Sequence, residues 1–254
     1  RKQLVKRTIN SVLSQVYQNI EIILVNDGGE DVQEVVDEFN SPRIKYIQNK
    51  QNMGLAGTRN AGMAQAQGEA FAFLDDDDIF NNWAISFRLW AMSELQNSLK
   101  KPVEIVYSRA LQDIWEKQGD TYVSVHKQLY WDSPFDRDLI LIQNIAPCCC
   151  PLFSRKAWDD SGNYKFDEKL DTSEDFDFWI ALSRKTDFYE LKLIDCECSY
   201  RKDSTQMTGS RNFGKAYPTI YRRWRETAVN KKWVKEGQNN VLKNMGYNPK
   251  DFYL

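Results

Sequence analysis

Apolar residues in the first third of the chain recur with two different spacings. Between Leu4 and Leu13 they lie three or four positions apart, which is the spacing of one helix face. Ile20–Val25 is a nearly continuous, mostly β-branched run, as expected of a parallel strand covered on both sides. The alternation continues with a helix over Val32–Phe39, a strand over Ile44–Ile47, a helix over Gly54–Gln67, a strand over Ala70–Leu74 and a long helix from about Asn82. This order predicts an α/β domain with a Rossmann-like, mostly parallel sheet flanked by helices.

Beyond residue 100 the pattern is less regular. It predicts a strand over Val103–Tyr107, a hairpin over Trp115–Trp131 turning at Gly119-Asp120, a short helix over Asp136–Ile142, a strand over Pro151–Phe153, a helix over Ser173–Ser183, one or two strands over Phe188–Tyr200, and terminal helices over Asn212–Asn230 and Trp233–Met245. We therefore expect one large domain over residues 1–211, of the size of a catalytic domain, with a smaller mixed region in its second half. A helical extension should follow over residues 212–254.

The first predicted element is a helix. A doubly wound domain usually begins with an apolar strand that becomes central in its sheet. We therefore expect that strand to lie upstream of Arg1.

Bulk composition limits the possible functions. Apolar residues make up 42% of the chain, which supports a full globular core, and no apolar run approaches the ~18–20 residues that span a bilayer. The net charge of -2 argues against a dedicated nucleic-acid binder, which carries a basic excess. The single histidine, His126, also argues against most mechanisms that need a positioned imidazole.

The five cysteines comprise the consecutive Cys148–Cys150 and the alternating pair Cys196 and Cys198. An odd number without a framework-like spacing indicates reduced thiols and a cytoplasmic protein, free or at the cytoplasmic face of a membrane. A structural zinc site usually requires CxxC-type pairs or added histidines, so we do not expect one here.

The strongest chemical signal is Asp75–Asp78, which directly follows the predicted strand over 70–74. Adjacent carboxylates repel one another, and a divalent cation offsets that cost. Hard oxygen ligands select Mg²⁺ or Mn²⁺, with substrate phosphates completing the shell. The carboxyl ends of strands are also where α/β folds bind ligands. The alternative is a solvated acidic turn in which Asp78 caps the next helix.

Two further segments have the chemistry to contact a nucleotide. Asp27 ends the strand over 20–25 and could accept hydrogen bonds from a base or ribose, although an Asn-Asp-Gly sequence also forms ordinary turns. Asn52–Gly62 combines small residues with Arg59, whose planar guanidinium suits a base or phosphate. Tight helix–sheet packing with a surface arginine is the alternative for this segment.

A third acidic segment opens the aromatic helix over 173–183. Ser173 can cap that helix, and the helix dipole favours Glu174 and Asp175 in its first turn. The neighbouring Phe and Trp residues indicate a partly desolvated site, where a carboxylate becomes more basic. Raised basicity is the property that a general base needs.

Taken in order, these motifs resemble those of family-2 glycosyltransferases of the GT-A fold. The sequence contains Asp27-Gly28, then Asn-x-Gly and Arg-Asn-x-Gly within 52–62, then Asp75–Asp78, then Glu-Asp-x-Asp-x-Trp over 174–179. The second motif is one residue short between Gly54 and Arg59. The segment Asn144–Tyr164 is similar to the family's acceptor-side segment, so the resemblance covers about residues 1–205.

The resemblance implies how a donor binds. Asp27 and Arg59 contact the nucleobase, Asp75 faces the ribose, and Asp76 belongs to the same donor-binding set. Asp77 binds Mn²⁺ or Mg²⁺ on the diphosphate. The expected donor is a nucleotide-diphosphate sugar, with UDP as the default nucleotide.

The resemblance also implies an inverting reaction with Asp175 as the catalytic base. Asp175 removes a proton from the acceptor hydroxyl as that hydroxyl attacks C1, while the cation stabilises the leaving diphosphate. The expected acceptor is a glycan, a lipid-linked sugar or a protein.

One position departs from the family pattern. Many relatives have a histidine after the last strand, in a Tyr-Arg-x-His context, where this chain has Asp203. Asp203 is therefore a second candidate metal ligand, and an exposed loop carboxylate is the alternative.

Two other functions fit parts of the sequence. A nucleotidyltransferase would assemble the nucleotide sugar, and a sugar-nucleotide-binding module would bind it without catalysis; the intact acidic motifs argue against the second. In the extension, Trp224 and Trp233 either meet a membrane surface or partner domain, or pack a terminal helix.

Overall fold

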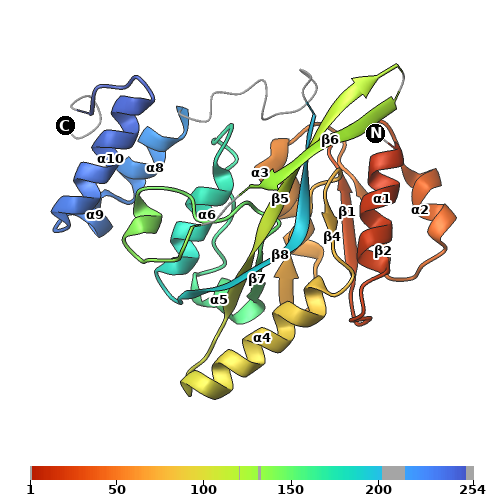
Figure 1. The fold of residues 1–254 in the computed structure, drawn as a ribbon, viewed down its shortest axis with the longest axis horizontal. Coiled ribbons are helices and arrows are strands. Elements are labelled where there is room, and N and C mark those ends of the chain that lie inside the picture. The colour runs from red at the N-terminus through yellow and green to blue at the C-terminus, as the bar shows by residue number, and fades with distance from the viewer. Residues whose placement is uncertain (1, 120, 131–132, 202–214, 250–254) are drawn as a thin grey trace.

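Strands and helices alternate up to residue 72 of the computed structural model, as their spacing predicts, and an unpredicted short strand over residues 79–80 precedes the next helix (Figure 1). The structure describes residues 2–119, 121–130, 133–201 and 215–249. Its strands are β1 (Ile22–Asn26), β2 (Ile44–Gln48), β3 (Ala70–Ala72), β4 (Ile79–Phe80), β5 (Ile105–Gln118), β6 (Thr121–Leu129), β7 (Pro151–Ser154) and β8 (Phe188–Arg201). Its helices are α1 (Lys2–Leu13), α2 (Gln33–Phe39), α3 (Gly54–Gln65), α4 (Ala84–Leu99), the 3₁₀ turn η1 (Leu139–Leu141), α5 (Arg155–Asp160), α6 (Glu174–Ser183), α8 (Tyr217–Arg223), α9 (Arg225–Ala228) and α10 (Lys232–Asn244).

The strands form a parallel pair, β1–β2, and a larger mixed sheet. The larger sheet has the order β3-β7-β5-β8-β4, and β6 extends it by pairing with β5. β5 and β8 run parallel, whereas β7 is antiparallel to both β3 and β5. The predicted α/β class is confirmed, and the larger sheet is more mixed than expected because β7 returns between β3 and β5.

Helix α6 lies between the larger sheet and the C-terminal helices (Figure 1). Nine of its ten residues are buried. Phe178 stacks on Phe166 with ring centroids 4.2 Å apart, and Trp179 packs edge-on against Phe153 at 5.8 Å. A helix that is covered on all sides is a rigid support, so the carboxylates at its first turn have fixed positions.

The C-terminal helices share the main core. Ile220 and Leu242 are fully buried in it. Asp177 of α6 accepts hydrogen bonds from Trp224 Nε1 at 2.8 Å and from the Tyr164 hydroxyl at 2.9 Å. Trp224 therefore packs a terminal helix, the second of the two interpretations of this residue. Within the described residues no helix is long and apolar enough to cross a membrane.

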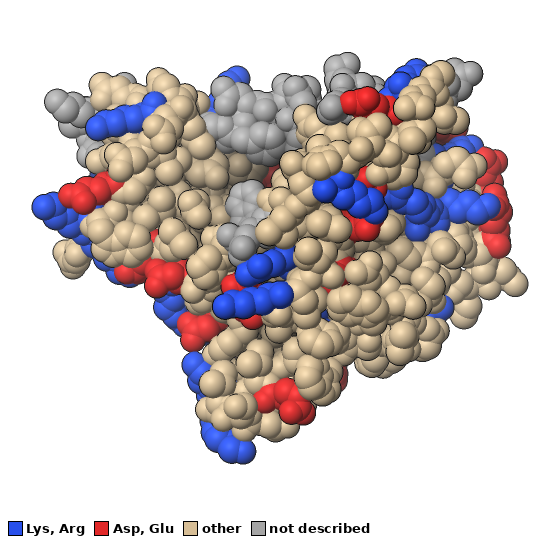
Figure 2. Space-filling view, in the orientation of Figure 1, with Lys and Arg blue, Asp and Glu red and all other residues tan. Residues whose placement is uncertain are grey.

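Charged side chains of both signs are interspersed on the face shown in Figure 2. Lys2 and Lys6 of α1 pair with Glu34 and Glu38 of the neighbouring α2. Exposed pairs of this kind contribute little to stability because water screens them.

Several elements differ in extent from the predictions. β5 continues to Gln118 instead of ending at Tyr107, because a register shift lets it keep pairing with β8. The helix predicted over 136–142 is the single turn η1. The hairpin of β5 and β6 is confirmed, and Gly119 has the positive φ, 62°, that suits a tight turn.

The helix cap predicted at Asp78 is wrong, and Ser173 has the predicted N-cap position of α6 without the side-chain bond of a cap. Asp78 precedes β4 rather than a helix, and its Oδ1 accepts a hydrogen bond from the Ser199 backbone N–H at 2.8 Å. Ser173 has a left-handed φ of 58° and makes no side-chain cap bond. At Asp78 a tertiary contact with β8 has replaced the local one that sequence reasoning expected.

Candidate active site

The acidic turn, Asp75–Asp78, links β3 to β4 and is held by the end of β8. Arg201 Nη1 donates to Asp77 Oδ2 at 2.7 Å, and the Ser199 hydroxyl donates to the Asp77 carbonyl at 2.6 Å. Asp77 is buried, whereas the Asp75 side chain is 47% exposed. The turn thus presents one accessible carboxylate beside a fixed, buried one.

Negative charge is crowded at this turn. Burial raises the pKa of Asp77 above its ordinary value, and the carboxylates of Asp76 and Asp75 raise it further. The Arg201 guanidinium opposes the shift. A second positive charge brought here would therefore be stabilised.

The residues present fit a cation that a ligand helps to hold. Among the described residues, three ligand atoms lie within 4.8 Å of one another only in groups that contain cysteines. Mg²⁺ is commonly bound by one or two carboxylates plus substrate phosphates, so Asp77 together with a diphosphate matches that pattern. Asp203, the second candidate ligand, lies outside the described residues. Binding of Mn²⁺ or Mg²⁺ stays a prediction.

Arg59 connects the acidic turn to α6. Its Nη2 lies 3.1 Å from Asp75 Oδ1, and its Nη1 lies 2.5 Å from Glu174 Oε1. The guanidinium also lies over the rings of Phe73 and Phe166, at 5.9 and 5.6 Å from their centroids. Arg59 is only 8% exposed, so the interpretation as a surface arginine is wrong. Its contact with a nucleobase stays a prediction, because both Nη atoms already bind carboxylates.

Asp27 orders the loop between β2 and α3. Its Oδ1 accepts hydrogen bonds from Asn49 Nδ2 at 3.0 Å and from the Met53 backbone N–H at 2.7 Å. This places Asp27 at the carboxyl end of β1, where α/β folds bind ligands. Its contact with a base or ribose stays a prediction.

Asp175 begins α6 and is partly buried. Its Oδ2 accepts a hydrogen bond from Asn144 Nδ2 at 3.1 Å, and its Oδ1 accepts one from the Phe176 backbone N–H at 2.8 Å. Burial, followed by the nearby Glu174 carboxylate, raises the pKa of Asp175 to about 7. Asp175 therefore has the basicity that proton removal at neutral pH requires.

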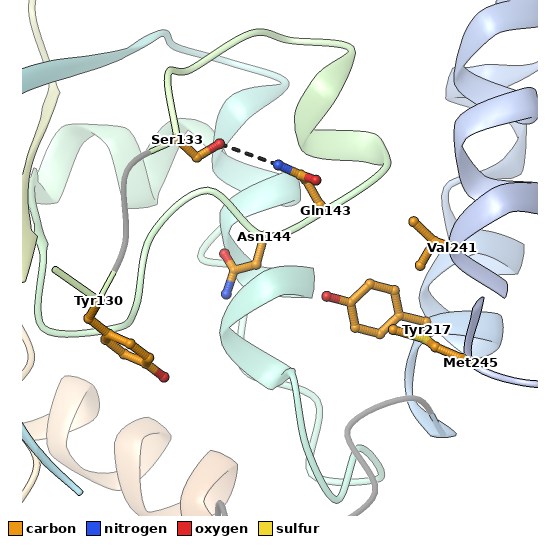
Figure 3. Close-up of a pocket in the computed structure, with 7 residues that line it drawn as sticks. All are labelled: Tyr130, Ser133, Gln143, Asn144, Tyr217, Val241 and Met245. Carbon is orange, nitrogen blue, oxygen red and sulfur yellow. Dashed lines mark hydrogen bonds between the residues drawn. The ribbon is translucent and has the colours of Figure 1, made fainter. Parts of the chain in front are cut away.

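A pocket of about 450 Å³ lies between the loop that carries Asn144 and the C-terminal helices (Figure 3). It is lined by Tyr130, Ser133, Gln143, Asn144, Tyr217, Val241 and Met245. Asn144 belongs to the lining and also bonds Asp175, so the pocket and the base are neighbours. Burial, followed by the nearby Asp175 carboxylate, raises the pKa of Tyr217 to about 12, so this tyrosine is neutral. The pocket offers aromatic faces and amide groups, which suit a polyhydroxylated ligand.

Comparison with known proteins assigns the family. Residues 1–158 match the model of Glycosyl transferase family 2, which is more than half of the chain. The chain belongs to glycosyltransferase family 2. The resemblance seen in the motifs is thereby confirmed.

Two curated glycosyltransferases illustrate the similarity, and the chain aligns with only part of each. An uncharacterized glycosyltransferase of Rickettsia prowazekii is 28% identical over 185 residues, covering 72% of this chain and 56% of its own length. The GalNAc(5)-diNAcBac-PP-undecaprenol beta-1,3-glucosyltransferase of Campylobacter jejuni is 27% identical over 222 residues, covering 85% of this chain and 67% of its own. The chain thus spans little more than half the length of the first of these relatives.

The fold of this family-2 domain is that of solved GT-A glycosyltransferases. S. aureus TarS in complex with UDP-GlcNAc superposes with a TM-score of 0.62, covering 97% of this chain and 70% of that chain. The identity is 15%, so the likeness concerns the fold alone. The predicted GT-A class is confirmed.

Sequence reasoning missed part of this site. Asn144 stood only at the edge of a predicted segment, and nothing in the sequence singled out Tyr217, Val241 or Met245. Their place in the pocket depends on how the C-terminal helices pack, which no local motif encodes. The pairing of Arg59 with Glu174 is of the same kind, because 115 positions separate the two residues.

Proposed function

We propose that this family-2 domain transfers a sugar from a nucleotide-diphosphate sugar to an acceptor hydroxyl, with inversion at the anomeric carbon. The observation that carries the proposal is that one arginine, Arg59, joins the acidic turn to the carboxylates at the start of α6. Arg59 bonds Asp75 of the acidic turn and Glu174, the neighbour of Asp175. Donor and acceptor chemistry are thus held at a fixed separation on rigid elements.

The acidic turn is the donor side. Asp75 is accessible to a ribose or phosphate, and Asp77 offers a carboxylate to a divalent cation shared with the diphosphate. Asp77 and the diphosphate would hold Mn²⁺ or Mg²⁺ there, and a bound ion would supply positive charge beside the leaving diphosphate. Asp27, at the end of β1, lies on the side expected to meet the nucleotide. A UDP-sugar is the first donor to test, because the similar TarS binds UDP-GlcNAc.

Asp175 is the base on the acceptor side. Its Oδ atoms are oriented by Asn144 and by the backbone at the start of α6. The acceptor hydroxyl gives its proton to Asp175 as its oxygen forms a bond to C1 of the sugar. The bond between C1 and the diphosphate breaks on the opposite side, so the configuration inverts and the nucleoside diphosphate leaves.

The pocket beside Asp175 is where we place the acceptor. Tyrosine rings pack well against sugar rings, and the amides of Gln143 and Asn144 can bond hydroxyls. A lipid-linked glycan is the favoured acceptor, because the Campylobacter jejuni relative is named for an undecaprenol-linked substrate. Such an acceptor would bring the enzyme to the cytoplasmic face of a membrane.

Nucleotide release tests this function against its alternatives. The chain is incubated with a panel of nucleotide-diphosphate sugars and Mn²⁺, with and without undecaprenol-diphosphate-linked glycans. Transfer predicts release of nucleoside diphosphate that depends on the acceptor. Pyrophosphate production from a nucleoside triphosphate would instead show a nucleotidyltransferase, and saturable binding without release would show a binding module.

A further inference from the structure

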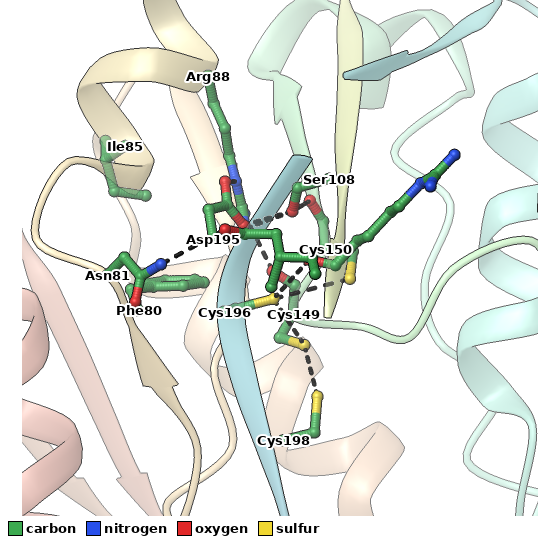
Figure 4. Close-up of polar contacts among 12 residues, drawn as sticks. Phe80, Asn81, Ile85, Arg88, Ser108, Cys149, Cys150, Asp195, Cys196 and Cys198 are labelled. Carbon is green, nitrogen blue, oxygen red and sulfur yellow. Dashed lines mark hydrogen bonds and ion pairs between the residues drawn. The ribbon is translucent and has the colours of Figure 1, made fainter. Parts of the chain in front are cut away.

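Four thiols from two distant segments of the sequence converge where β8 meets the loop before β7 (Figure 4). Cys149, Cys150 and Cys196 are buried, and Cys198 is partly buried. The Sγ atoms of Cys149 and Cys196 are 3.7 Å apart, and those of Cys150 and Cys196 are 3.8 Å apart. All three lie within 4.8 Å of one another.

These separations match the geometry of a metal–thiolate site. A tetrahedral Zn²⁺ ion has bonds of about 2.3 Å to cysteine sulfur, which places its sulfur ligands about 3.8 Å apart. We propose that Cys149, Cys150 and Cys196 bind one thiophilic divalent cation, represented by Zn²⁺. Soft sulfur ligands distinguish this site from the acidic turn, whose oxygen ligands suit Mg²⁺ or Mn²⁺.

A fourth ligand is close to the three sulfur atoms. Cys198 Sγ lies 3.1 Å from Cys149 Sγ, so a rotation about its side-chain bonds can bring it to the same ion. An Asp78 carboxylate oxygen lies within 4.8 Å of the Cys149 and Cys198 sulfur atoms and is the oxygen alternative. Either one completes the four-coordinate shell that is typical of structural zinc.

The thiols lie in the main apolar core, and a buried polar cluster borders them there. Arg88 is fully buried and donates to the Cys149 carbonyl at 3.0 Å, and its Nε lies 2.7 Å from Asp195 Oδ2 (Figure 4). Its guanidinium interacts electrostatically with Cys150 and Cys196. Arg88 is paired with the Asp195 carboxylate, so the two side chains together add no net charge beside the ion.

Binding is a coordination step that requires no oxidant or reductant. Each thiol that joins the ion loses its proton to solvent as the sulfur–metal bond forms. The ion would tie the Cys149-Cys150 loop to β8, and Ser199 of β8 holds the acidic turn. The ion would thus brace the strand that holds the acidic turn, and its binding does not depend on the proposed reaction.

Titration with Co²⁺ tests the site directly. The reduced chain is titrated with Co²⁺ alone in excess Mg²⁺, which saturates oxygen-rich sites. We expect one equivalent of Co²⁺ to produce a sulfur-to-cobalt charge-transfer band that one equivalent of Zn²⁺ abolishes. Cys149→Ala and Cys196→Ala should each lose the band, whereas the matched control Cys148→Ala, at a buried cysteine outside the group, should keep it.

Wild-type protein provides a second measurement that does not depend on how the variants fold. Zn²⁺ added to the reduced, metal-free chain should raise its Tm, because the ion binds the folded state. It should also protect three or four thiols from alkylation. Absence of both the charge-transfer band and the Tm shift in folded wild-type protein would overturn the proposal. An undiminished band in Cys149→Ala and Cys196→Ala would overturn it as well.

Discussion

The donor side and the acceptor side of the site are built in different ways. The acidic turn is a run of four adjacent residues fixed by the end of one strand, β8. The acceptor side takes Asp175 from α6, Asn144 from the loop after η1 and Tyr217 from α8. A short motif can encode the first arrangement, whereas the second exists only after the C-terminal helices have packed. The two sides should therefore respond differently to mutation, and Arg59 should affect both.

The largest effect on chemistry is expected at Asp175. Asp175→Asn keeps the shape and most of the hydrogen bonds but cannot accept the proton. We expect transfer to slow by about 10²–10⁴-fold, the usual cost of losing a general base, with donor affinity unchanged. Single-turnover transfer and calorimetric donor binding measure the two quantities. Asp171→Asn, at an exposed carboxylate just before α6, is the matched control. Lost donor binding in Asp175→Asn would move this residue to the donor side.

Arg59→Met should damage both sides. It leaves the buried Glu174 carboxylate without its partner, and breaking a buried ion pair costs about 3–5 kcal/mol of unfolding free energy. We expect lower stability in urea, together with weaker donor binding and slower transfer. The double variant Arg59→Met with Glu174→Gln should regain part of the stability, since no buried charge then remains unpaired. A stability equal to wild type in the single variant would show that the pair does not join the two sides.

Asp77→Ala should weaken ligand binding on the donor side and lower stability as well, because it removes one partner of the buried ion pair with Arg201. Removing the carboxylate should abolish the increase in nucleoside-diphosphate affinity that Mn²⁺ provides, an effect we expect to be about tenfold or more. Calorimetry with Mn²⁺ and with EDTA, in wild type and variant, measures it. Equal affinities for wild type in the two conditions would rule out a cation at Asp77.

Tyr217→Leu should affect the acceptor side alone, and less strongly. Loss of one aromatic face is worth about 1 kcal/mol, so we expect the KM for the acceptor to rise several-fold while the KM for the donor is unchanged. Tyr217→Phe keeps the ring and should behave nearly as wild type. A rise confined to the donor KM would place the acceptor elsewhere.

The features that the sequence predicts are those encoded by adjacent residues, and the features that it does not predict depend on packing between distant segments. The order of strands and helices, the place of the acidic turn and the position of Asp175 at the start of a helix were all predictable, because adjacent residues encode them. The pairing of Arg59 with Glu174 was not, since it depends on how α3 and α6 pack. Neither was the convergence of the cysteines, because residues from two segments meet only when β8 lies beside the loop before β7.

The cap expected at Asp78 is wrong for a related reason. Local rules predict that a polar residue just before a helix caps that helix. The Asp78 carboxylate instead accepts a hydrogen bond from the backbone N–H of Ser199 in β8, 121 positions away. Tertiary hydrogen bonds can therefore outweigh a cap. The mixed pairing of β7 was also outside local reasoning, since a four-residue apolar strand carries no signal of its direction.

The pH dependence of transfer tests the central claim most directly. Asp175 must be ionised to accept a proton, and its pKa is raised to about 7. Single-turnover transfer at saturating donor should therefore fall about tenfold per pH unit below pH 7 and level off above it, and Asp175→Asn should lose this inflection. A wild-type rate that stays constant down to pH 5, or an Asp175→Asn variant that keeps the inflection, would contradict the assignment of Asp175 as the base.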